Sequence, residues 1–129
     1  MAILQVNHLA KTFSNSTIVL KDISFTVEKG ECLSIIGSSG SGKSTLLRCL
    51  NLLETPTSGE IIFNNENILD KKVNKNLIRS KLCMVFQSFN LFNNMDVLTN
   101  CVIGQTKVLK RSKKEATEIA LRNLEKVGM

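Results

Sequence analysis

Apolar and polar residues alternate in two segments near the N-terminus, at residues 3–6 and 23–27. Such alternation places every second side chain on the same face, which is typical of β-strands with one face open to water. Turn-forming residues at 14–16 lie between the two segments, so we expect an antiparallel layer. A further short strand, at residues 61–63, follows a turn at 56–59 and is expected in the same outer layer.

Two other apolar runs, at residues 32–36 and 82–86, are nearly continuous rather than alternating. Strands that are covered on both faces of a parallel sheet have this composition. The sequence therefore predicts that both runs are strands and that they supply the core.

The pattern also predicts two helices. The first spans residues 43–51 and begins straight after a glycine-rich loop; its apolar stripe, which can lie on a sheet, consists of Leu46, Leu47 and Leu50. The second begins with a capping box formed by Ser112 and Glu115, and Gly128 stands where a left-handed C-cap is expected. One face of this second helix is apolar and comprises Ala116, Ile119, Ala120, Leu124 and Val127.

Composition narrows the class of protein. The chain has 129 residues, 43% hydrophobic and 22% charged, which is typical of a globular domain and too short for two large ones. The net charge of +6 suits phosphate-bearing partners without specifying one. The four cysteines are widely spaced, which favours reduced thiols in the cytosol over a metal site or a disulfide framework. We expect neither a signal peptide nor a membrane span.

Residues 37–44, Gly-Ser-Ser-Gly-Ser-Gly-Lys-Ser, fit the pattern G-x-x-x-x-G-K-[ST] at every fixed position. Glycines at positions 37, 40 and 42 allow backbone conformations closed to other residues, so that amide groups can point at phosphate oxygens. The helix N-terminus adds a positive dipole end. Lys43 can bridge the outer two phosphates and Ser44 can ligate Mg²⁺. The loop predicts binding of a nucleoside triphosphate; the alternative is a Gly/Ser-rich loop with a chance lysine.

Several motifs in this order resemble those of ABC transporter ATP-binding subunits. They are residues 20–25, Gly30-Glu31, residues 37–45, residues 56–59 and residues 84–87. A narrower resemblance, to the polar amino acid uptake subfamily, is carried by residues 46–54 followed by residues 86–92. Together these motifs cover essentially the whole chain.

The resemblance implies an α/β fold, the P-loop NTPase core of ABC ATPase type with an N-terminal antiparallel β layer. The β layer and P-loop core would occupy about residues 1–88, and about 89–129 would begin a helical subdomain. Phe13 would stack on adenine, although a core phenylalanine is the alternative. Gln87 would position Mg²⁺ and the attacking water, although a strand-end glutamine without function is the alternative.

The cofactors implied are ATP and Mg²⁺, with Ser44 and Gln87 as metal ligands. The residues implied to bind the nucleotide are Phe13, Gly37, Ser38, Ser39, Gly40, Ser41, Gly42, Lys43, Ser44 and Thr45.

The resemblance further implies ATP hydrolysis coupled to amino acid import at the cytoplasmic face of the cell membrane. Its partners would be integral membrane permease subunits, a second copy of the ATP-binding subunit and, indirectly, a substrate-binding protein. The apolar cluster Phe89, Leu91 and Phe92 would meet the permease or would form a small satellite core. Nucleic acid is not expected, because no aromatic residue accompanies the basic residues of 93–129. Alternatives are subunits for lipoprotein release or cell division, a P-loop kinase or phosphotransferase, and a nonfunctional remnant.

Several motifs of the family are absent from these 129 residues. They are the LSGGQ signature, the magnesium-binding aspartate, the catalytic glutamate beside it and the switch histidine; the one histidine, His8, is expected to be structural or on the surface. We interpret the chain as the N-terminal part of a longer ATPase. In the 129-residue chain alone, strands 32–36 and 82–86 would lack the partner strands that the rest of the domain supplies. Exposed strand edges favour aggregation. We therefore expect the chain alone to bind ATP weakly or not at all, and not to turn it over.

Overall fold

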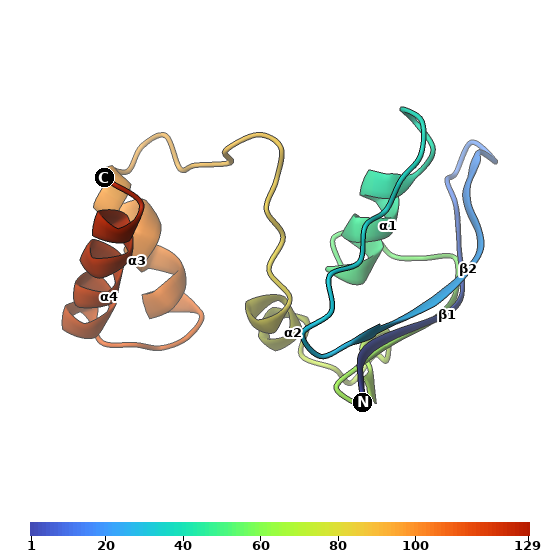
Figure 1. Cartoon of the computed structure of the whole chain (residues 1–129), viewed down its shortest axis with the longest axis horizontal. Helices are drawn as coiled ribbons and strands as arrows, with labels where there is room; N and C mark the ends of the chain where they lie inside the picture. Colours follow the sequence, from blue (N-terminus) through green and yellow to red (C-terminus); the bar gives the residue numbers. More distant parts are fainter. The chain divides into compact units, whose positions relative to one another are not determined.

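The computed structural model describes residues 1–129 and divides into two compact units, Met1–Met84 and Val85–Met129. Figure 1 traces their elements in chain order. Each unit has its own hydrophobic core. The expected combination of an antiparallel layer with helices of an α/β fold is therefore present.

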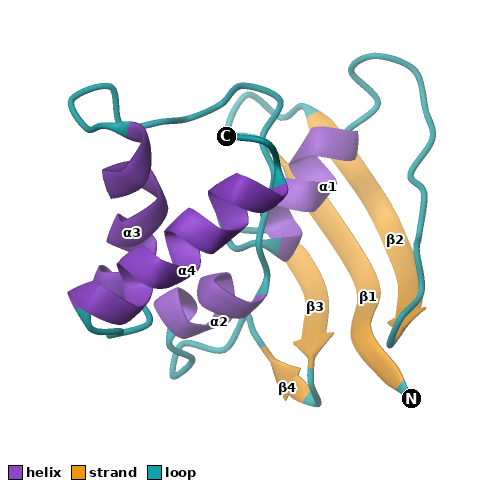
Figure 2. Cartoon of the chain, turned by 60° about the vertical axis from the view of Figure 1, so that its left-hand side comes forward, coloured by secondary structure: helices purple, strands orange, loops and turns teal.

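A four-stranded antiparallel sheet forms the first unit's outer layer. Its strands are β1 (Ala2–Thr12), β2 (Ile18–Glu28), β3 (Ser58–Phe63) and β4 (Glu66–Asn67), in the order β2-β1-β3-β4. Figure 2 shows them side by side in orange. In the central strand, Val6 faces Phe25 of β2 and Ile61 of β3. The antiparallel layer predicted from the alternating segments is confirmed.

Helix α1 (Lys43–Leu50) packs on one face of this sheet, as the apolar stripe predicts. Leu46 and Cys49 are buried in the same cluster as Leu9 of β1 and Ile61 of β3. The stripe itself is partly different from the prediction, because Leu47 is 43% exposed. Successive helical residues are about 100° apart, so a residue next to Leu46 cannot share its inward face.

Helix α2 (Lys75–Lys81) was not predicted. The Asn74 side chain caps its first turn by accepting from the backbone amides of Asn76 and Leu77, and Ile78 enters the core. Its Arg79 guanidinium donates to the carbonyl of Leu52 at 2.7 Å. This contact satisfies a carbonyl just beyond the C-terminal end of α1, where backbone acceptors lack helical partners.

The second unit contains α3 (Val97–Lys107) and α4 (Lys113–Lys126), which pack through a small core of Val102, Ala116 and Ala120. Ser112 accepts a hydrogen bond from the Glu115 amide at 3.2 Å, and Gly128 has φ 77°, so the predicted ends of α4 are confirmed. Helix α3 was not predicted; the Asp96 carboxylate caps it. Hydrogen bonding by the side chain and the amide of Thr99 lowers the pKa of Asp96. None of the helices is long and apolar enough to cross a bilayer.

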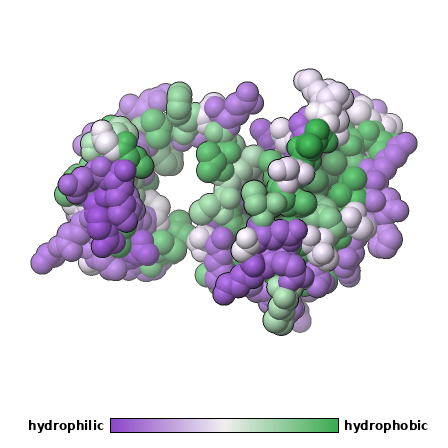
Figure 3. All heavy atoms as spheres, viewed as in Figure 1, coloured by the Kyte–Doolittle hydropathy of each residue, from purple (hydrophilic) through white to green (hydrophobic).

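The prediction of buried strands at residues 32–36 and 82–86 is wrong for this structure. Both segments run without a ladder partner. Ile36 is 94% exposed and Val85 is 95% exposed. An apolar run becomes a strand only when a neighbour accepts and donates its backbone hydrogen bonds, and neither segment has one. Both units consequently carry apolar side chains on their surfaces, as Figure 3 shows in green.

Candidate phosphate-binding site

The loop at residues 37–44, called the P-loop below, leads directly into α1. Two of its glycines have left-handed backbone conformations, Gly40 at φ 77° and Gly42, the N-cap of α1, at φ 96°. Between them, the Ser41 amide closes a turn onto the carbonyl of Ser38 at 3.2 Å. Gly37 does not share this conformation; a Cβ there would lie 2.6 Å from the Ser41 hydroxyl, a contact that rotation of the serine side chain can relieve.

At Gly42 the backbone of the P-loop also packs closely against the sheet. A Cβ on this residue would lie 2.9 Å from the carbonyl oxygen of Val19 and 3.1 Å from a methyl group of Leu20, both on β2. The close approach of backbone to backbone is possible only without a side chain. The position of the loop is therefore set by β2 as well as by α1.

The Lys43 ammonium lies within the P-loop. It donates to the carbonyls of Gly37 at 2.7 Å and Ser38 at 2.6 Å, and lies 3.4 Å from the Ser41 hydroxyl. All these acceptors are uncharged, and the first turn of α1 carries no acidic residue. The positive charges of the ammonium and of the helix N-terminus are thus uncompensated, which favours an anion.

A hollow of about 250 Å³ lies against the loop. It is lined by Val19, Gly40, Gly42, Lys43, Ser44 and Thr45. Five of these six residues were predicted from the sequence to bind the nucleotide; Val19 was not, because its contact comes from a distant strand. Ser44 is exposed and lines the same hollow as Lys43, so its hydroxyl is an oxygen donor available to a cation that accompanies phosphate.

Phe13 lies at the same end of the first unit as the P-loop. Its amide donates to the carbonyl of Thr17 at 2.9 Å in the turn between β1 and β2, two residues before Val19 of the hollow. Figures 1 and 2 both show this turn and the loop at one end of the sheet. The ring is only half-buried and lies outside the core cluster, so the alternative of a core phenylalanine is wrong. Its contact with adenine stays a prediction.

Gln87 and the P-loop fall in different units of the structure. Gln87 is exposed and belongs to the second unit, whereas Lys43 belongs to the first, so a shared magnesium site stays a prediction. The nearby Phe89 is 92% exposed, and Leu91 and Phe92 are also exposed, so they do not form a satellite core. His8 is on the surface, as expected, 2.6 Å from the Asp22 carboxylate.

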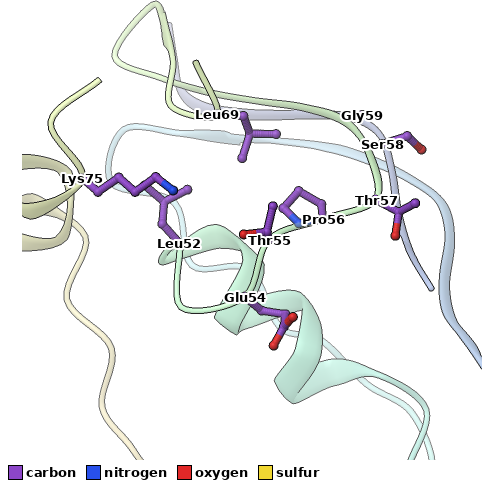
Figure 4. Close-up of a pocket in the computed structure, with 9 residues that line it drawn as sticks. All are labelled: Leu52, Glu54, Thr55, Pro56, Thr57, Ser58, Gly59, Leu69 and Lys75. Carbon is purple, nitrogen blue, oxygen red and sulfur yellow. The ribbon is translucent and has the colours of Figure 1, made fainter. Parts of the chain in front are cut away.

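A second hollow, of about 210 Å³, lies beyond the opposite end of α1 and is shown in Figure 4. Sequence reasoning did not predict it. Glu54 is on its wall with the carboxylate paired to Lys11, and Lys75 is its one cationic side chain. It has no glycine-rich loop, and the α2 N-terminus at Lys75 that borders it has the amides of Asn76 and Leu77 already bonded to the Asn74 side chain, so the P-loop is the better candidate for phosphate.

The sequence pattern of the ABC transporter family matches residues 20–129. The chain belongs to this family. It is 48% identical over 122 residues to the glutamine transport ATP-binding protein GlnQ of Geobacillus stearothermophilus, covering 95% of this chain and 50% of that protein. It is 49% identical over 122 residues to the histidine/lysine/arginine/ornithine transport ATP-binding protein HisP of Salmonella typhimurium, covering 86% of this chain and 47% of that protein.

Solved structures of ABC cassettes share the fold. The dimeric ATP-binding cassette MJ0796 bound to ADP and Pi matches 95% of this chain and 56% of its own, with a TM-score of 0.81 and 27% identity. CbiO1 of Clostridium perfringens, part of the transporter complex cbiONQ, matches 99% of this chain and 51% of its own, with a TM-score of 0.75 and 30% identity. The family and fold class that the motifs implied are confirmed. The chain spans about half the length of the curated relatives it matches.

The two left-handed glycines of the P-loop should respond differently to a methyl group. Gly40→Ala adds a Cβ with no atom within 4 Å and should cost about 1 to 2 kcal/mol for the backbone conformation alone. Gly42→Ala adds the clash with Val19 and should cost at least about 1 kcal/mol more. Urea unfolding of both variants measures the difference, and equal losses would show that β2 does not constrain the loop.

Proposed function

We propose that this protein is an ATP-binding subunit of an ABC importer for polar amino acids, in which binding and hydrolysis of ATP drive transport. The observation that carries the proposal is the P-loop, held at the N-terminus of α1 with the Lys43 charge uncompensated. Support for the nucleotide comes from a cassette of this fold that holds ADP and Pi. Support for the transported substrate comes from the relatives, which are named for glutamine and for histidine, lysine, arginine and ornithine.

In the proposed site the triphosphate lies along the P-loop. Loop amides donate to its oxygens, and the Lys43 ammonium exchanges the neutral carbonyls of Gly37 and Ser38 for charged phosphate oxygens. The ammonium is attracted more strongly to a negatively charged phosphate oxygen than to a neutral carbonyl oxygen at the same distance, so the exchange favours binding. Ser38, Ser39, Ser41 and Thr45 would add hydroxyl groups around the phosphates.

The Ser44 hydroxyl and the Gln87 amide oxygen would hold Mg²⁺. Both are uncharged oxygen donors of the kind this ion accepts beside phosphates. When bound, the ion would neutralise part of the phosphate charge. Gln87 would also orient the attacking water, and the Phe13 ring would stack on the adenine.

The partners follow from the same proposal. Permease subunits in the membrane, a second ATP-binding subunit and, through the permease, a substrate-binding protein would complete the transporter at the cytoplasmic face. The cluster Phe89, Leu91 and Phe92 supports a permease contact, because exposed apolar clusters mark interaction surfaces. In this proposal residues 89–129 begin the helical subdomain of the cassette.

Lys43→Ala should weaken ATP binding by about tenfold or more, because it removes the charge-assisted contacts to the phosphates. Lys72→Ala, which removes an exposed lysine from a turn of the same unit, should leave binding unchanged. Titration of the 129-residue chain with millimolar Mg-ATP, followed by phosphorus NMR of the ligand, detects the weak binding expected. Equal binding by the Lys43 variant and the parent chain would contradict the proposed site. Sustained phosphate release that Lys43→Ala abolishes would contradict the expected lack of turnover.

The substrate class has its own test. Deleting the gene from its host should abolish uptake of at least one radiolabelled polar amino acid, and the intact gene should restore it. The gene with Lys43→Ala should not restore uptake, because the protein would no longer hold the triphosphate. Normal uptake of every polar amino acid in the deletion strain would contradict the substrate class while leaving ATP binding intact.

A further inference from the structure

Lys11 is the one charged residue buried in this structure. It lies on β1, and its ammonium is 2.6 Å from the Glu54 carboxylate and 2.7 Å from the carbonyl oxygen of Thr55. The same ammonium lies over the ring of Phe13, 4.8 Å from the ring centroid. A buried lysine thus joins an acidic residue to the aromatic ring at the nucleotide end of the sheet.

We propose that Lys11 is a positioning residue for the base of the nucleotide, because it holds the Phe13 ring as a stacking platform. The inference rests on the proposed function, since it takes Phe13 as the residue that contacts adenine. Lys11 itself would not touch the nucleotide. It would act through the ring.

The surroundings of Lys11 explain why its charge can stay in the interior. Burial of an ammonium is costly unless its three donors are satisfied. Glu54 and Thr55 accept from it, and the π face of Phe13 supplies a further favourable contact, within the range of about 6 Å at which cation–π attraction acts. The Lys11 ammonium therefore contacts one face of the half-buried Phe13 ring, and its own position is fixed by hydrogen bonds to Glu54 and Thr55.

A cation over one face of a phenyl ring has a consequence for the other face. The ring's faces carry negative charge in its quadrupole, which disfavours direct stacking on another π system. Attraction of this electron density toward the Lys11 ammonium makes the opposite face less negative. Stacking of a purine on that opposite face becomes more favourable.

Glu54 connects this platform to the phosphate end of the site. The Glu54 amide donates to the carbonyl of Arg48 in α1 at 3.1 Å, and the N-terminus of the same helix carries the P-loop. The Lys11–Glu54 ion pair spans 43 positions of the sequence. The ion pair therefore fixes the position of the Phe13 ring relative to α1. The distance between the ring, which would contact the base, and the P-loop, which would contact the phosphates, is then constant.

The test compares ligands with and without a base. In the 129-residue chain, Lys11→Met should weaken binding of Mg-ATP about threefold to tenfold, equivalent to about 0.7 to 1.4 kcal/mol. Binding of magnesium triphosphate, which lacks adenosine, should not change. Lys11→Arg should restore ATP affinity, because a guanidinium keeps both the charge and the aromatic contact. Lys21→Met removes an exposed lysine of β2 and is the matched control.

A folding defect would be distinguishable from a positioning defect. Lys11→Met leaves the partly buried Glu54 carboxylate unpaired, so the double variant Lys11→Met/Glu54→Gln keeps the fold testable, with circular dichroism and thermal unfolding as checks. A purely structural role would weaken both ligands by the same factor and would overturn the inference. Unchanged ATP affinity of the Lys11→Met variant would also overturn the inference. So would unchanged ATP affinity of a Phe13→Ala variant, and in both cases the proposed phosphate binding by the P-loop would stand. Failure of the parent chain to bind either ligand would instead contradict triphosphate binding by the P-loop of this chain, and the inference with it.

Discussion

The packing of α1 against the antiparallel sheet is the constraint on which the candidate site depends. Leu46 and Cys49 bury their side chains with Leu9 of β1, and Gly42 brings the start of the helix against β2. The P-loop ends at this helix N-terminus, so the helix position decides where the loop amides and Lys43 point. Apolar burial, which carries no chemical specificity, thereby places a group of donors whose chemistry is specific for anions.

Lys43 and Lys11, both in the first unit, differ in the groups that surround their ammonium groups and therefore in what their charges can do. The Lys43 ammonium touches only uncharged oxygens, so its charge is available to a phosphate. The Lys11 ammonium is paired with the Glu54 carboxylate in a buried position, so little of its charge reaches solvent and its effect is local. Burial also raises the pKa of the neighbouring Cys49 thiol, which keeps that residue a protonated core side chain. Most of the chain's remaining basic residues lie on the surface.

Local patterns predicted those parts of the fold that local interactions specify. The alternation of apolar and polar residues was sufficient to predict β1 and β2. The capping serine predicted the start of α4, and the motif spacing predicted the P-loop. The caps Asn74 and Asp96 were the signals for α2 and α3, but α2 is only 7 residues long and Gly104 weakens the helical pattern of α3. The lack of a pairing partner at residues 32–36 and 82–86, and the contact of Lys11 with Glu54, depend on residues far apart in sequence, which composition cannot specify.

The central claim is that the P-loop, preformed on α1 and β2, is where this chain holds a triphosphate. The most direct measurement is the change in backbone amide NMR shifts of the 129-residue chain on titration with Mg-ATP. We expect the largest changes at residues 37–45, with changes at Val19, and no change in α4. Changes centred on the hollow at residues 52–59 or on the second unit, with an unchanged P-loop, would contradict it.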